Sequence, residues 1–237
     1  MPERCFGGKT MKLLFIHGAG GTKSKWRKIE TLLSNKNYEA IDLPGHGENK
    51  DNAITSIQNY AAYTNELIQE ETIVVGHSMG GLIALELAEI NKNVKGIVLA
   101  ASFYELPVHQ KLLDKLSVGE FPPSLFHASY SKETSTELIE EEKKELGLVP
   151  VGISHADFRA TNTYKEGEER LASLKIPVCS ILGEQDRLLP PGAIDAFKKV
   201  RGDMKISIIN GSGHNVMVEK PKEFVEKLEE FLQEVQM

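Results

Sequence analysis

The chain has 237 residues and a mass of 26.3 kDa; 41% of its residues are hydrophobic, 26% are charged, and its net charge is −6. This composition is typical of a globular protein with one large domain, or one domain with an insertion, and excludes a disordered or fibrous chain. Because 34 Asp and Glu outnumber 28 Lys and Arg, the chain lacks the basic excess that nucleic acid binding requires, and no nucleic-acid partner is expected.

Cysteine usage and hydropathy indicate where such a chain resides. Cys5 and Cys179 are its only cysteines, which is too few for a disulfide framework or a cysteine metal site. The N-terminal residues hold no apolar signal segment, and no stretch approaches the roughly 18 apolar residues of a membrane span. We therefore expect a cytoplasmic protein without a membrane span.

Short apolar runs alternate with amphipathic stretches along most of the chain. The apolar runs are typical of strands buried on both faces of a parallel sheet, and they lie at residues 12–16, 38–42, 72–75, 94–100, 178–182 and 205–209. Helix-length stretches lie between or after most of them, at residues 55–70, 79–91, 192–200 and 221–235. The alternation predicts an α/β fold with a doubly wound, mainly parallel sheet of about six strands.

One long segment, residues 102–171, interrupts this alternation and contains no convincing strand. A structureless loop of this length is rare in a compact domain, so we interpret the segment as a helical cap insertion on a core of residues 1–101 and 172–237. Its Glu-rich run at 137–145 is interpreted as a solvated helix face. The apolar side chains of this segment, and Trp26 before it, either line a pocket or pack the cap on the core: Trp26, Phe103, Leu106, Leu112, Leu116, Phe121, Leu125, Phe126 and Tyr130.

The segment Gly76-His77-Ser78-Met79-Gly80-Gly81 stands between a strand-like TIVV and a helix-like LIALELAEI. This is a G-x-S-x-G motif in its strand, turn and helix context, which indicates a nucleophilic serine on a strained turn. Glycine is expected at 76 and 80 because a side chain there would collide with neighbouring backbone. The N-terminus of the following helix would favour an oxyanion beside Ser78.

A serine hydroxyl needs a base, and the base needs an orienting acid. His214 is the base that we predict, because it lies in the Gly-rich loop after the last strand, and Asp186, just after the fifth strand, is the predicted acid. Glu184 in the same loop is the alternative to Asp186. The other histidines lie in other loops, in the serine motif or in the insertion: His17, His46, His77, His109, His127 and His155.

The loop after the first strand, residues 17–21 with the sequence HGAGG, can supply backbone N–H groups to a tetrahedral oxyanion. We expect the N–H groups of Ala19 and Met79 to be the two donors, with Gly20 as the alternative to Ala19 because spacing alone does not decide between them. The loop has neither G-x-G-x-x-G nor a GK[ST] ending, which disfavours nucleotide binding.

Taken together, these segments resemble the α/β-hydrolase fold family, in its serine esterase and lipase-like branch with a helical cap. Five segments carry the resemblance: HGAGG at 17–21, DLPGHG at 42–47, GHSMGG at 76–81, GEQDRLLP at 183–190 and SGHNVMVEKP at 212–221. The order Ser, Asp, His along the chain is also that of this family and differs from the chymotrypsin-like and subtilisin-like orders.

The resemblance implies that Ser78, Asp186 and His214 are nucleophile, acid and base, that the amides of Ala19 and Met79 form the oxyanion hole, and that Asp42 and His46 belong to a structural loop. Few residues precede the first parallel strand, so the N-terminal hairpin of the family is expected to be reduced or missing. The expected spatial order of the strands is second, first, third, fourth, fifth, sixth. HGAGG differs from the HGGG of one esterase and lipase branch, which weakens any transfer of substrate preference.

A serine in the motif argues against haloalkane dehalogenase and epoxide hydrolase chemistry, which uses an aspartate at that position in this family. The sequence therefore predicts a carboxylesterase for small or medium, largely apolar esters, working through an acyl-enzyme without a metal or organic cofactor. The alternatives are a thioesterase or acyltransferase, a carbon–carbon hydrolase or lyase, and a non-enzymatic ligand receptor. The oligomeric state is left open.

Overall fold

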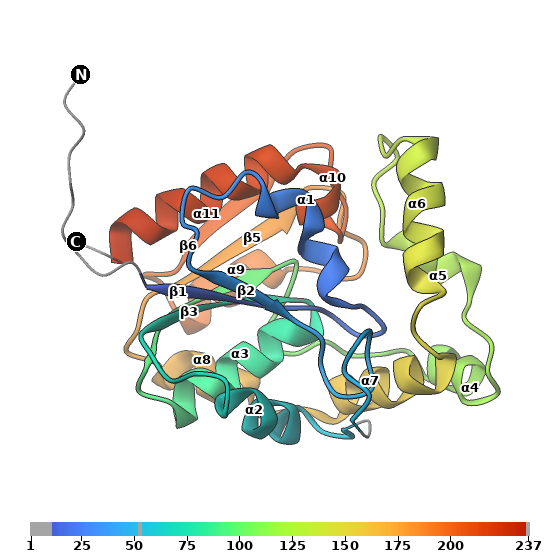
Figure 1. Cartoon of the computed structure of the whole chain (residues 1–237), viewed down its shortest axis with the longest axis horizontal. Coiled ribbons are helices and arrows are strands. Elements are labelled where there is room, and N and C mark those ends of the chain that lie inside the picture. The colour runs from blue at the N-terminus through green and yellow to red at the C-terminus, as the bar shows by residue number, and fades with distance from the viewer. Residues whose placement is uncertain (1–10, 52–53, 236–237) are drawn as a thin grey trace.

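The computed structural model describes residues 11–51 and 54–235, and within these the chain forms one six-stranded, all-parallel sheet (Figure 1). The strands are β1 (Lys12–Ile16), β2 (Tyr38–Ile41), β3 (Thr72–His77), β4 (Val94–Ala100), β5 (Val178–Gly183) and β6 (Lys205–Ile209). Their order, β2-β1-β3-β4-β5-β6, confirms the predicted one. The expected remnant of an N-terminal hairpin falls on residues 1–10 and lies outside the described residues.

Helices cover both faces of the sheet, and each layer buries its own apolar cluster against the strands. One layer consists of α2 (Ile57–Asn65), α3 (Met79–Ile90), α8 (Gly167–Ser173) and α9 (Ala193–Val200). The other consists of a 3-10 turn, η1 (Lys23–Trp26), followed by α1 (Arg27–Glu30), α10 (Val216–Glu219) and α11 (Pro221–Val235). Because the middle strands β3 and β5 are buried along their whole length, they need apolar side chains on both faces.

Two helices show how local sequence sets these elements. In α11, Phe224, Leu228 and Phe231 recur at helical spacing and are all buried against the sheet. The helix α2 begins where the Ser56 hydroxyl accepts from the Asn59 N–H at 3.2 Å. It ends at residue 65, earlier than predicted, and the Asn91 side-chain amide donates to the Asn65 side-chain oxygen at 2.8 Å near that end.

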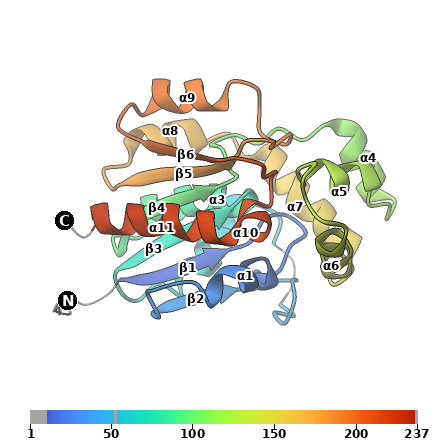
Figure 2. The ribbon, with the colours of Figure 1, turned by 90° about the horizontal axis from the view of Figure 1, so that it is seen from above.

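Between β4 and β5 the chain forms α4 (Gln110–Ser117), α5 (Pro123–Ala128), α6 (Thr136–Leu146) and α7 (Val151–Thr163). These four helices lie together beyond one end of the sheet, as both ribbon views show (Figures 1 and 2). The helix α8 follows them, spans the predicted boundary at residue 171, and lies against α3 and α9 on the sheet. The division into a core and a 102–171 cap stays a prediction.

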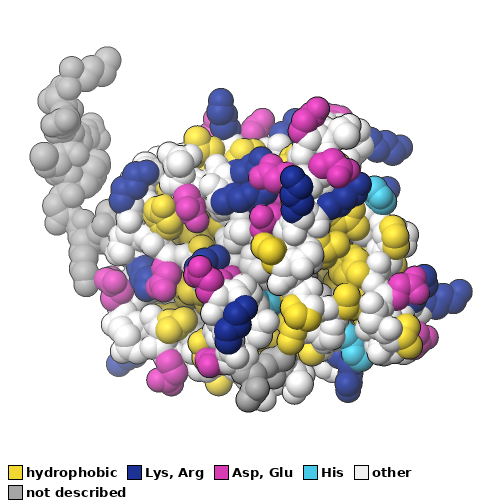
Figure 3. Space-filling model, turned by 45° about the vertical axis from the view of Figure 1, so that its right-hand side comes forward, with side chains coloured by type: hydrophobic (Ala, Val, Ile, Leu, Met, Phe, Trp, Pro, Cys, Tyr) yellow, Lys and Arg dark blue, Asp and Glu magenta, His cyan; other side chains and the backbone are white. Residues whose placement is uncertain are grey.

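The Glu-rich run at 137–145 is a solvated helix face only in part: Glu137 and Glu140 are exposed, as its composition predicts, whereas other side chains of the run are turned inward. Glu142 of α6 is fully buried and binds Lys25, Arg27 (2.6 Å) and the Tyr130 hydroxyl (2.7 Å), while its neighbour Glu141 also binds Arg27. The reason is tertiary: the basic stretch in η1 and α1 faces this side of α6. Acidic and basic side chains also lie next to one another on the face of the molecule shown in Figure 3.

No helix within residues 11–51 and 54–235 has both the length and the apolar composition to cross a membrane. The cytoplasmic location stays a prediction.

The buried Glu142 makes the attachment of α6 sensitive to acid. Burial by itself raises the pKa of Glu142, but the charge of Lys25 and hydrogen bonds from Lys25, Arg27 and Tyr130 outweigh it and hold the pKa at about 2, below the usual 4.5. A lowered pKa adds stability that is complete above pH 4.5 and is lost as the pH falls towards 2. We expect Glu142→Gln to lower the free energy of unfolding at pH 7 by up to about 3 kcal/mol.

Urea unfolding at several pH values tests this. The difference between wild type and Glu142→Gln should shrink between pH 4.5 and pH 2, because the wild-type carboxylate becomes protonated there. Glu140→Gln is the matched control, since Glu140 lies on the same helix and pairs only with exposed Lys143 among the described residues. A difference of the same size in the control, or one that does not depend on pH, would contradict the prediction.

Candidate active site

The turn between β3 and α3 holds Ser78 at φ +52° and ψ −118°, in a region that side chains other than glycine rarely adopt. The glycines on either side leave room for this turn. A Cβ at Gly76 would lie 2.1 Å from the Gly80 carbonyl oxygen, and a Cβ at Gly80 would lie 2.4 Å from the Ile16 carbonyl oxygen. Only glycine therefore fits at either position, as the sequence motif predicts.

Two hydrogen bonds from the end of β4 fix the backbone of this turn. The Ser78 N–H donates to the Ala100 carbonyl at 3.0 Å, and the Ser102 hydroxyl donates to the Ser78 carbonyl at 2.7 Å. Ser78 itself is half-buried at the N-terminus of α3. The first N–H groups of a helix have no partner within it, and Met79 is the first residue of α3.

The structure brings His214 and Asp186 together although 28 residues separate them. His214 Nδ1 lies 2.8 Å from Asp186 Oδ2, and both side chains are almost fully buried. Because a carboxylate only accepts hydrogen bonds, Nδ1 is the donor of this pair, and in the neutral ring Nε2 is then the nitrogen with the lone pair. The other Asp186 oxygen accepts from the Leu188 N–H at 2.8 Å, whereas Glu184, the alternative acid, accepts from the Gly211 N–H at 3.0 Å.

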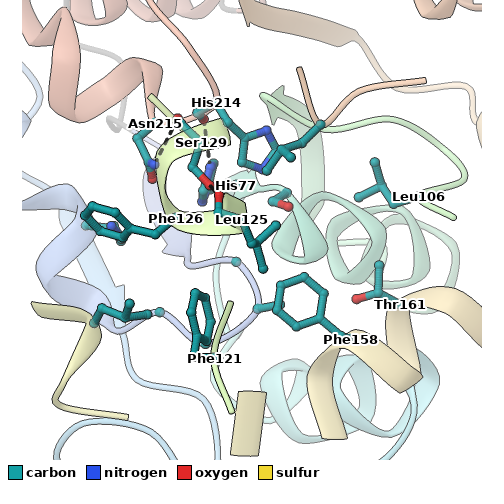
Figure 4. A pocket seen from close by; sticks show the side chains of 18 of the residues that line it. His77, Leu106, Phe121, Leu125, Phe126, Ser129, Phe158, Thr161, His214 and Asn215 are labelled. Carbon is teal, nitrogen blue, oxygen red and sulfur yellow. Dashed lines mark hydrogen bonds between the residues drawn. The ribbon is translucent and has the colours of Figure 1, made fainter. Parts of the chain in front are cut away.

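The loop that carries His214 is held from three sides. The Gly213 N–H donates to Glu219 Oε1 at 3.0 Å, and the His214 N–H donates to the Ser129 carbonyl of the insertion at 3.0 Å. His77 Nε2 donates to the His214 carbonyl at 3.0 Å (Figure 4). Burial and the neighbouring His214 ring lower the pKa of His77 well below its usual value, so His77 is a neutral support for this loop.

A cavity of about 370 Å³ lies beside the serine turn and the His214 loop, and its volume is near the lower end of the range for small-molecule sites. Ser78, His77 and His214 border it on the sheet side, and Phe121 and Phe158 face it from the insertion (Figure 4). Its apolar wall consists of Leu106, Pro107, Val108, Leu112, Phe121, Leu125, Phe126, Leu146, Phe158 and Leu188. The hydrogen bonds of the described residues do not include one between Ser78 and His214; such contacts often tighten only when substrate binds.

Three of the apolar residues considered as pocket residues lie elsewhere: Trp26, Phe103 and Leu116. Trp26 is fully buried in the core, where its ring packs against Phe15 at 4.9 Å and Phe224 at 6.1 Å between centroids. The helical turn after the loop of residues 17–21 points the indole at the sheet and not at the cavity. For Trp26 the packing alternative is therefore the correct one.

The loop after β1 forms a tight turn at the edge of the cavity. The Gly21 N–H donates to the Gly18 carbonyl at 3.1 Å, and Gly20 has φ +64°. The Gly20 N–H is already engaged, because it donates to Asp157 Oδ2 at 2.8 Å. Ala19 and Gly20 both border the cavity, and of these two candidate donors the Gly20 N–H is bound to Asp157 within the protein.

Sequence reasoning missed Asp157, a fully buried residue of α7. It lies in the insertion, in no motif, and its partners Gly20, His46 and Tyr60 are at least 97 residues away, so no local signal marks it. His46 has the structural role that the resemblance implies. Asp42 does too: its carboxylate accepts from the backbone N–H groups of Lys23 (2.7 Å) and Glu48 (2.9 Å).

A strained serine between a parallel strand and a helix, beside a buried His and Asp pair and under helices inserted after β4, defines the class of α/β-hydrolase-fold proteins. The model of the alpha/beta hydrolase family matches residues 13–227. The chain belongs to this family. The described residues contain no group of three or more His, Cys, Asp and Glu side chains that could hold a metal ion.

Known proteins of several activities are similar to this chain. A Haemophilus influenzae protein, designated provisionally a 2-succinyl-6-hydroxy-2,4-cyclohexadiene-1-carboxylate synthase, is 26% identical over 92% of this chain and 96% of its own length. Lipase 1 of Psychrobacter immobilis is 25% identical, over 92% and 76% of the two chains. The solved structure of a thermophilic esterase is 28% identical with a TM-score of 0.80, over 96% and 92% of the two chains.

Because the backbone of Gly76 packs closely against the Gly80 carbonyl, we expect stability to depend on glycine at position 76. Gly76→Ala should lower the free energy of unfolding by about 3 kcal/mol or more, because the new methyl group would overlap the Gly80 carbonyl. Gly152→Ala is the control, since a Cβ there meets nothing within 4 Å, and it should leave stability unchanged or raise it by up to about 1 kcal/mol. Thermal and urea unfolding measure both, and equal effects of the two substitutions would refute the assignment.

Proposed function

We propose that this protein is a serine carboxylesterase for small to medium, largely apolar esters, with Ser78 as nucleophile, His214 as base and Asp186 as acid. The observation that carries the proposal is the 2.8 Å bond between His214 Nδ1 and Asp186, because it fixes the tautomer whose Nε2 can accept a proton, beside the cavity that Ser78 also borders. The esterase and lipase among the similar proteins support the same chemistry.

In the proposed reaction, His214 Nε2 takes the proton of Ser78 Oγ while the oxygen attacks the ester carbonyl carbon. The N–H groups of Ala19 and Met79 stabilise the resulting oxyanion. The imidazolium, stabilised by Asp186, gives its proton to the departing alcohol and leaves an acyl-enzyme. Water then attacks the acyl-enzyme with His214 again as base, which releases the carboxylic acid and restores the serine.

The choice of Ala19 over Gly20 as oxyanion donor follows from what each amide already binds. The Gly20 N–H donates to Asp157, so its rotation towards a substrate would leave a buried carboxylate without that donor. Ala19 precedes it in the same turn, and both residues border the cavity.

The substrate class follows from the cavity wall. The larger share of the wall is aliphatic and aromatic, so it gains from burying apolar acyl or alcohol groups. The charged residues that also border the cavity, Lys25, Glu142, Glu145 and Arg187, already have hydrogen-bond partners within the protein. On the face shown in Figure 3, acidic and basic side chains are mixed, whereas an acyl-CoA thioesterase would be expected to present a basic entrance. This favours simple esters over acyl-CoA.

The second candidate is a carbon–carbon lyase or hydrolase, which the provisional synthase of Haemophilus influenzae favours. Such an enzyme would use His214 and Ser78 to break a carbon–carbon bond instead of an ester bond. Turnover of a panel of simple esters against carboxylated ring substrates separates the two candidates, and ligand binding without turnover of either would favour a receptor.

The proposal predicts a large and selective effect of Ser78→Ala. Its kcat on p-nitrophenyl acetate or butyrate should fall by about 10³-fold or more, because no other group replaces the nucleophile. The melting temperature should stay equal to or above that of the wild type, since the small side chain removes no packing. Ser117→Ala, at an exposed position of α4, is the control. Full activity of Ser78→Ala would exclude the proposed nucleophile.

The apolar wall predicts a dependence on acyl length. The value of kcat/KM should rise by about fourfold for each methylene beyond acetyl, as expected for burial worth about 0.8 kcal/mol per methylene, and fall once the chain outgrows the cavity. Leu125→Phe narrows the cavity and should move the optimum to shorter chains, whereas Leu148→Phe, at an exposed position outside the cavity wall, should not. If the optimal acyl length were the same in Leu125→Phe as in wild type, the cavity would not be the acyl-binding site.

A further inference from the structure

Asp157 of α7 joins the insertion to three separate parts of the core. Its Oδ2 accepts from the Gly20 N–H at 2.8 Å and from His46 Nε2 at 2.8 Å, and its Oδ1 accepts from the Tyr60 hydroxyl at 2.7 Å. Asp157, His46 and Tyr60 are all fully buried. A carboxylate with this many buried donors is held in one orientation, so each donor is held as well.

His46 is the cation that pairs with the buried Asp157 carboxylate. Its Nδ1 lies 3.1 Å from the Pro44 carbonyl while Nε2 faces Asp157, so both ring nitrogens donate and the ring is an imidazolium. Burial opposes this charge, but the hydrogen bond to Asp157 and the carboxylate charge outweigh it and raise the pKa of His46. The adjacent His17 ring is neutral, with its pKa lowered to about 4 by burial and by His46.

The helix α7 also packs against the turn of residues 18–21 at a second residue, Ser154. Ser154 precedes Asp157 by one helical turn, and a Cβ on Gly20 would lie 2.6 Å from Ser154 Oγ. Gly20, with φ +64°, is therefore packed against α7 as well as bonded to it. The Ala19–Gly20 peptide has its nitrogen held by Asp157, while the Gly18 carbonyl accepts from the Gly21 N–H.

We propose that Asp157 is a positioning residue that makes α7 of the insertion part of the catalytic apparatus, by holding the turn of residues 18–21 so that the Ala19 N–H points at the oxyanion. This inference rests on the proposed function. In a hydrolase built this way, α7 is a fixed wall of the site throughout turnover, since its departure would release the Gly20 N–H and expose an ion pair whose partner lies in the core.

The first test measures steady-state kinetics on a short p-nitrophenyl ester. Asp157→Ala should lower kcat by about tenfold to a hundredfold while KM changes by less than about threefold, because the apolar wall that binds the ground state is untouched and only transition-state stabilisation is lost. Asp157→Asn keeps one acceptor oxygen and should fall between Asp157→Ala and wild type. This split between kcat and KM, with partial rescue by the conservative variant, is not expected of a residue that merely supports the fold.

Glu86→Gln is the matched control. Glu86 is another buried carboxylate that ties the insertion to the core: it accepts from the Tyr164 hydroxyl just beyond α7 at 2.9 Å and from Arg170 Nε at 3.1 Å. It touches neither the turn of residues 18–21 nor the cavity wall. Its kcat should stay within about twofold of wild type, and an equal loss in Glu86→Gln and Asp157→Asn would overturn the proposal.

A second measurement needs no substrate. Amide hydrogen exchange at Gly20 should be at least about tenfold faster in Asp157→Asn or Asp157→Ala than in wild type and unchanged in Glu86→Gln, because only Asp157 binds that N–H. Tyr60→Phe, which removes only the Oδ1 donor, serves if both Asp157 variants fail to fold, and should speed exchange less. Unchanged exchange at Gly20 would overturn the proposal, whereas fast exchange in a wild type-like fold without any ester turnover would overturn the proposed function alone.

Discussion

The close backbone approach at the turn between β3 and α3 is the constraint on which the site depends. Neither Gly76 nor Gly80 has room for a Cβ, and this lets the chain reverse sharply with Ser78 at positive φ. Backbone bonds from the end of β4 hold the strained turn. Because all strands of the sheet are parallel, the loops after β1, β5 and β6 reach the same edge and surround this serine.

Buried carboxylates connect the inserted helices to this edge. Asp157 joins α7 to the loops after β1 and β2, and Glu142 joins α6 to Lys25 of η1 and Arg27 of α1. Each is compensated by a cation from the core, because an unpaired charge in these positions would be strongly destabilising. The insertion is thus attached by specific, directional contacts, and its apolar residues remain available to form the cavity wall.

Sequence reasoning failed where a residue's role depends on a partner far along the chain. The Glu-rich run has the composition of a solvated helix, and only the facing side chains of Lys25 and Arg27 make Glu142 a buried residue. For Trp26 the sequence left a pocket role and a packing role open, and only the structure shows that a helical turn carries its ring into the core. Asp157 carries no motif at all, since its donors come from three distant segments.

The sequence by itself determined the parallel sheet, its strand order and the serine turn, because buried strands and a turn without room for side chains leave strong local patterns in residue type. It also singled out Asp186 and His214, since both follow strands whose ends meet at one edge, and the structure places these two side chains in contact. Only the tertiary structure showed that Asp186, and not Glu184, is the neighbour of His214. It also showed that the Gly20 N–H is bound to Asp157, and that Asp157 and Glu142 are each paired with a cation from a distant segment. Those outcomes depend on distances between segments far apart in the chain, which no local pattern records.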